Sequence, residues 1–148
     1  MYSWLLFVHI IAAMVWVGGA LTLSALATHV LREGSGVGRF IASLRVIGPA
    51  VFAPAPILVI GLGVWIVLLS DSVTFGQGWI AASFVLFGAA FLVGAVFQSR
   101  AAIAAQRAAE ADRLEEAGRH LRRWSWGSRV IVALLAVATW VMVFKPGV

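Results

Sequence analysis

The sequence predicts an all-α protein: a bundle of four transmembrane helices with an extended cytoplasmic helix between the third and the fourth. Hydrophobic residues make up 62% of the 148 residues, which is more apolar side chain than a soluble core of this size buries. Charged residues make up only 11%. They divide the chain into four apolar stretches, each near the length of about 20 residues that a span needs. Residues 1–148 are therefore expected to form a single integral membrane domain.

The first predicted helix covers about residues 2–31 and contains no Asp, Glu, Lys or Arg. It is longer than a bilayer core requires, so we expect it to tilt or to protrude. The other spans are predicted at about residues 49–69, 79–97 and 128–144. Prolines 54 and 56 remove backbone donors near the start of the second span, so its first turns are expected to be distorted.

The third helix is expected to extend beyond the membrane to about residue 123. The segment 100–123 is rich in alanine and spaces Glu and Arg or His four residues apart, as in Glu115 with Arg119 and Glu116 with His120, which supports an exposed helix. Two interpretations stay open for this segment. It is either a docking surface for a partner or acidic lipid, or a solvated helical connector.

The charge distribution predicts the orientation. Ten of the eleven Lys and Arg residues lie in the first and third connections, and only Lys145 lies on the other side. The positive-inside rule therefore places both termini outside the cytoplasm. We interpret the net charge of +5 as a topological signal, with the lipid bilayer as partner and no nucleic acid.

His9 is the ionisable side chain that the sequence places deep inside a span, where such groups are costly and are functional candidates. On a helix it shares one face with Trp16, Ala20 and Gly19. Small residues allow close helix packing in membranes, so this face is expected to point inward. Two readings remain open, a histidine bonded to a neighbouring helix or an axial ligand of a flat apolar cofactor such as haem.

Other ligands are few. The chain has no cysteine, which excludes thiolate metal sites, cysteine nucleophiles and covalent haem attachment. For a six-coordinate haem, Met142 is the plausible second ligand within one chain, whereas a dimer would supply a second His9. His9 is also the candidate metal ligand, but three Met and three His residues are few for a copper path.

Residues 6–13 (LFVHIIAA) and 15–19 (VWVGG) resemble the first helix of a family of small four-helix bacterial integral membrane proteins of unknown function, DUF2269-like. The Gly48-Pro49 turn and residues 142–146 (MVFKP) also resemble that family. The first-helix pattern is distantly similar to the membrane domain of copper-resistance protein D and to HemJ-type protoporphyrinogen oxidases. In the HemJ type a first-helix histidine serves haem, which implies that role for His9. HemJ-type proteins also share a functional lysine further along, whereas the one lysine here is Lys145.

The leading expectation is a haem b-binding membrane protein for electron transfer or porphyrin handling, with a redox or membrane-protein partner. In it His9 is the axial ligand, and Trp16 with Gly18, Gly19 and Ala20 shapes the pocket. The alternative is a non-enzymatic module, a homo-oligomer or a partner-binding subunit, in which the same stripe packs against another helix. A third expectation is permeation of a metal or small solute past His9. Whether the protein is an enzyme is left open.

Overall fold

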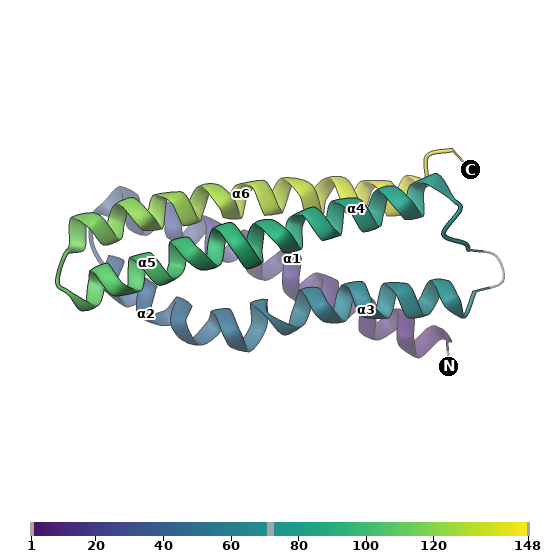
Figure 1. The fold of residues 1–148 in the computed structure, drawn as a ribbon, viewed down its shortest axis with the longest axis horizontal. Coiled ribbons are helices and arrows are strands. Elements are labelled where there is room, and N and C mark those ends of the chain that lie inside the picture. The colour runs from purple at the N-terminus through teal and green to yellow at the C-terminus, as the bar shows by residue number, and fades with distance from the viewer. Residues whose placement is uncertain (1, 71–72, 148) are drawn as a thin grey trace.

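The structure is a computed structural model that describes residues 2–70 and 73–147. Within these residues the regular secondary structure is entirely helical, which confirms the all-α fold class. Four helical rods are long and apolar enough to cross a membrane: Tyr2–Glu33, Val37–Leu68, Gly78–Glu110 and Leu114–Phe144. The rods lie alongside one another, and both termini lie at the same end of the bundle (Figure 1).

The first rod is a single helix, α1 (Tyr2–Glu33), of 32 residues. At 1.5 Å per residue it is about 48 Å long, well beyond a hydrocarbon core of about 30 Å. The chain then turns through Gly34 and Gly36, which have φ values of 67° and 77°. Glycine adopts this left-handed conformation without the steric penalty of a Cβ.

The second rod consists of α2 (Val37–Ile47), the π-helical segment η1 (Gly48–Phe52) and α3 (Pro54–Leu68). It begins well before residue 49, where the sequence placed the span. The reason is that α2 is amphipathic: it buries Phe40, Ile41 and Leu44 while its arginines stay exposed, so a criterion based on charge-free stretches misses it.

The predicted distortion at the start of the second span is confirmed in η1. The backbone N–H of Ala53 donates to the carbonyl of Gly48, 3.1 Å away and five residues back. Pro54 and Pro56 have no N–H to offer the carbonyls four residues before them. The wider π turn is a local adjustment of the kind found at such interruptions.

The third rod consists of α4 (Gly78–Leu92), the π-helical segment η2 (Val93–Gln98) and α5 (Ser99–Glu110). It does not continue to residue 123, because the chain turns after Glu110 through Asp112 at a φ of 57°. The fourth rod, α6 (Leu114–Phe144), starts at residue 114 instead of 128. The predicted extension is thus divided between two antiparallel helices. The segment is rich in alanine before the turn and carries helical Glu–Arg and Glu–His pairs after it, so both sides favour a helix and the turn is not revealed.

Buried side chains form four clusters in the part of the chain that the structure describes. Two of them mark the middle of the bundle and one of its ends. Near mid-bundle a core cluster joins α1, α3, α4 and α6, and it includes Trp16, Val59, Phe87 and Leu135. At the end opposite both termini, α2, α5 and the first turns of α6 pack on one another (Figure 1). We call this second assembly the arginine platform; its arginines are Arg39, Arg45, Arg100, Arg107, Arg113, Arg119, Arg122 and Arg123.

Large apolar side chains cover the outside of the rods. Trp4, Val85 and Val143 are 73%, 70% and 68% exposed. In water such surfaces would associate, whereas in a bilayer they are solvated by acyl chains. The exposed faces and the length of the rods together define an integral membrane protein.

Candidate functional site

His9 lies on the inward face of α1, as predicted, and is 8% exposed. Its ring packs against α3 at Gly63. A Cβ built on Gly63 would lie 3.4 Å from Cε1 of His9 and 3.9 Å from Nδ1. Glycine at this position lets the backbone of α3 approach the imidazole closely, in the manner of small residues at membrane helix interfaces.

The polar atoms of His9 are only partly satisfied. The ring lies beside the backbone of Val59, one turn before Gly63 on α3. Nδ1 is buried and has no hydrogen-bond partner within the described part of the chain. A buried polar atom without a partner carries a desolvation cost. The imidazole is therefore both a packing element between α1 and α3 and a candidate ligand.

Trp16 lies in the interior, also as predicted, and is 3% exposed. Its ring centroid is 6.0 Å from that of Phe87 on α4, with the planes tilted by 31°. Val59 of α3 belongs to the same core cluster. The indole thus fills the space between three rods, which is the role of an ordinary core residue.

The small residues that follow Trp16 play different parts. A Cβ on Gly19 would lie 2.9 Å from Cζ of Phe52, so Gly19 admits that ring between α1 and the second rod. The neighbouring Gly18 is exposed and has nothing within 4 Å of a Cβ built on it. Ala20 is buried, and its carbonyl accepts a hydrogen bond of 3.5 Å from Oγ of Ser128. The structure therefore does not gather these residues around one pocket.

Met142 is half-buried and packs on the core cluster that contains Trp16. The contacts that surround His9 come instead from Val59 and Gly63. The structure thus shows Met142 as a packing residue on this cluster.

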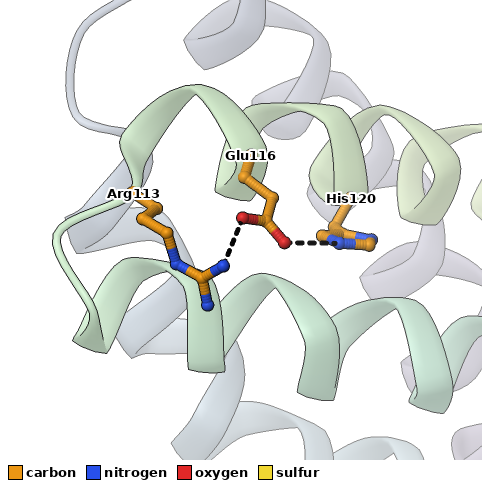
Figure 2. A network of polar contacts seen from close by, with 3 residues as sticks. All are labelled: Arg113, Glu116 and His120. Atoms are coloured by element: carbon orange, nitrogen blue, oxygen red, sulfur yellow. Dashed lines mark hydrogen bonds and ion pairs between the residues drawn. The ribbon is translucent and has the colours of Figure 1, made fainter.

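The three histidines are separate. His29 contacts Glu33 at 3.3 Å, and Nε2 of His120 lies 3.8 Å from Glu116, which also accepts a 2.7 Å hydrogen bond from Arg113 (Figure 2). The predicted pair of Glu116 and His120 is confirmed. In residues 2–70 and 73–147, no group of three His, Cys, Asp or Glu residues is placed to hold a metal ion.

Haem fits the donor chemistry of His9 but not its packing. A neutral imidazole with a free ring nitrogen is a suitable axial ligand. However, Gly63 of α3 lies against one edge of the ring, so the contact between α1 and α3 occupies that side of the imidazole. Neither of the two cavities described next is lined by His9. A porphyrin at His9 would therefore require α1 and α3 to separate beside the ring, and we derive no chemistry through haem.

Both cavities lie at helix interfaces rich in arginine. One, of about 590 Å³, lies between α1 and α6, and its polar lining is Ser24, Thr28, His29, Arg32 and Arg129. The other, of about 360 Å³, lies between α5 and α6 on the arginine platform, and Arg100, Arg107 and Arg113 contribute to it. The four-residue spacing of Ser24, Thr28 and Arg32 signals a polar stripe in the sequence. The sequence does not predict that Arg129 also lines this cavity, because that depends on how α6 packs against α1.

Four apolar rods, an interior with few polar side chains and exposed apolar faces define a small four-helix membrane protein. The chain belongs to the family described as predicted integral membrane protein, DUF2269, whose family model matches residues 3–146. This match confirms the resemblance drawn from the first helix. A search of the curated proteins and a search of the solved structures found no match.

Proposed function

We propose that the protein is a non-enzymatic membrane module that binds an acidic segment of a partner protein through its arginine platform. One observation carries this proposal: the arginines are displayed on a packed helical assembly instead of a loose connection. Ile41 of α2, Ala105 and Ala108 of α5, and Ala117 of α6 form a core cluster of their own. Alongside it, the rings of Phe40 and Trp124 meet edge to face at 6.0 Å.

The platform extends past the bilayer. The 31 residues of α6 span about 46 Å at 1.5 Å per residue, so about 16 Å remains beyond a hydrocarbon core of about 30 Å. By the positive-inside rule we place this end in the cytoplasm of a bacterial cell, with both termini on the opposite side of the cytoplasmic membrane.

The charges of the platform favour an acidic partner. It carries eight arginines against Glu110, Asp112, Glu115 and Glu116. Glu110 is engaged by Arg45 at 3.1 Å, and Glu116 by Arg113. Exposed pairs of this kind contribute only about 0–1 kcal/mol each, so they position side chains more than they stabilise the fold. The arginines in excess supply a positive field that steers acidic groups.

The test measures binding of a fluorescent ten-residue polyglutamate peptide to the detergent-purified protein by anisotropy. Replacing Arg119, Arg122 and Arg123 together by Gln is expected to weaken binding about tenfold, the sum of several exposed charge contacts. Lys145→Gln removes a charge at the opposite end and serves as the control, with no expected change. Absence of peptide binding to the unaltered protein, or equal binding by the triple variant, would contradict the proposal.

Haem b binding through His9 is a second candidate function. The observation in its favour is the buried Nδ1, which has no hydrogen-bond partner among the residues that the structure describes. It requires α1 and α3 to separate at Gly63, because their contact fills the space beside the ring. Titration of the purified protein with hemin tests it. A Soret band that shifts at one equivalent, and that is lost in His9→Ala, supports haem binding, whereas the unshifted spectrum of free hemin removes this candidate.

A further inference from the structure

We propose that the cavity between α1 and α6 is a binding groove for one anionic phospholipid. Its volume is about 590 Å³. Arg32 on α1 and Arg129 on α6 line one end of it, and Leu21, Ala133 and Ala136 line the rest. A charged end that continues into an apolar trough matches a phosphate headgroup that continues into an acyl chain.

The two helices place the charges at the same end. Along α1 the lining runs from Leu21 to Arg32, and along α6 it runs from Ala136 to Arg129. In both helices the arginine is nearest the arginine platform, and the apolar residues lie toward mid-bundle. The stretch of α1 is about 16 Å long at 1.5 Å per residue, close to one leaflet of a hydrocarbon core of about 30 Å. The groove is therefore about as long as one acyl chain in one leaflet of the bilayer.

The headgroup end is organised by hydrogen bonds. Nη2 of Arg129 donates to Oγ1 of Thr28 at 3.2 Å, and the same hydroxyl donates to the carbonyl of Ser24 at 2.8 Å. This chain of contacts holds the guanidinium of Arg129 over the groove while leaving its other donors available. Arginine donors bind phosphate oxygens strongly and often in pairs.

The charge at this end is net positive. The nearby carboxylate is Glu33, which contacts His29 at 3.3 Å. The guanidinium groups of Arg32 and Arg129 remain as cations for a phosphate. Basic pockets between transmembrane helices at the cytoplasmic side suit anionic headgroups. With the orientation proposed for the platform, the lipid comes from the cytoplasmic leaflet.

The experiment is native mass spectrometry of the purified full chain with phosphatidylglycerol or phosphatidylcholine that carry the same acyl chains. Retention of phosphatidylglycerol over phosphatidylcholine is expected. Arg129→Gln should lower phosphatidylglycerol affinity about tenfold, the effect typical of losing a charge-assisted contact. Lys145→Gln, which removes the same charge at the other end, should leave it unchanged. Equal retention of the two lipids, or equal loss in the two variants, would overturn the proposal.

A second pair of variants tests the apolar trough without altering charge. Ala133 lines the groove, so Ala133→Phe is expected to block the acyl chain and reduce phosphatidylglycerol retention. Val137 is 49% exposed and lies outside the groove, so Val137→Phe serves as the matched control. Helical circular dichroism of each variant verifies the fold. Full retention by Ala133→Phe would show that no acyl chain occupies the groove. Displacement of the lipid by inorganic phosphate at equal concentration would show that the arginines bind free phosphate instead of a lipid.

Discussion

At the residue scale, the contacts between α1 and the second rod depend on glycines. Gly19 faces the ring of Phe52, and Gly63 faces the ring of His9. In lipid there is little hydrophobic drive between helices, so association relies on such close van der Waals contact. A Cβ added at Gly19 would displace the ring of Phe52, whereas one at Gly63 would be in ordinary contact with the imidazole, so a larger side chain is needed there to displace His9.

Gly19→Leu is expected to lower the free energy of unfolding by about 1–3 kcal/mol, the usual cost of overpacking. The physical reason is the 2.9 Å approach of Cζ of Phe52 to a Cβ on Gly19. Gly18→Leu is the matched control, because nothing lies within 4 Å of its Cβ position. Thermal unfolding in detergent measures both. Equal midpoints for the two variants would show that Gly19 does not fix this interface.

The contact between His9 and Gly63 predicts a coupled pair of substitutions. Gly63→Leu should destabilise the protein by about 1–3 kcal/mol through overpacking, and His9→Ala should relieve part of that loss by vacating the space. A double-mutant cycle on thermal unfolding measures the coupling, with an expected interaction of about 0.5–3 kcal/mol for residues in contact. Additive effects would mean that the imidazole and Gly63 do not share this space.

The sequence predicts the orientation of single residues well and their partners poorly. The inward face of α1 follows from the spacing of small residues, and it places His9 and Trp16 correctly in the interior. At about 100° per residue it also puts Gly18 on the side of α1 opposite His9, where the structure leaves Gly18 exposed. It does not show that Gly19 meets the ring of Phe52. Nor does it reveal that the ring of Trp16 packs against that of Phe87 on another rod, since the sequence of α1 does not specify which helix packs on it.

At the element scale, the apolar pattern locates the spans but not the ends of the helices. The apolar pattern marks the residues that contact the hydrocarbon core. The helix α2 and the start of α6 are amphipathic helices that lie beyond this core, so the pattern does not include them. The turn between α5 and α6 contains no Gly or Pro, the usual punctuation of a helix break. Asp112 takes the left-handed conformation there instead.

The turn at Asp112 gives a prediction for the platform. Left-handed backbone costs a residue with a Cβ about 1–2 kcal/mol, and β-branched residues tolerate it least. Asp112→Gly is therefore expected to keep or raise the thermal unfolding midpoint, and Asp112→Val to lower it. A lower midpoint for Asp112→Gly than for Asp112→Val would contradict the turn at this position.

At the scale of the whole molecule, the two ends of the bundle differ in charge and in packing. The platform end holds the arginines and a core built by α2, α5 and α6. The other end holds both termini (Figure 1) and Lys145, whose Nζ lies 5.4 Å from the ring centroid of Trp79. The proposed binding of acidic groups depends on this asymmetry, because the basic charge is concentrated at the platform end.

The most direct test of this account is the accessibility of single cysteines in spheroplasts to a membrane-impermeant maleimide. The chain has no cysteine of its own, so Ser3→Cys near the N-terminus and Ser43→Cys on α2, both exposed positions, report the two ends without background. We expect Ser3→Cys to be labelled in intact spheroplasts and Ser43→Cys only after permeabilisation. Labelling of Ser43→Cys without permeabilisation would put the arginine platform outside the cytoplasm and contradict its proposed role.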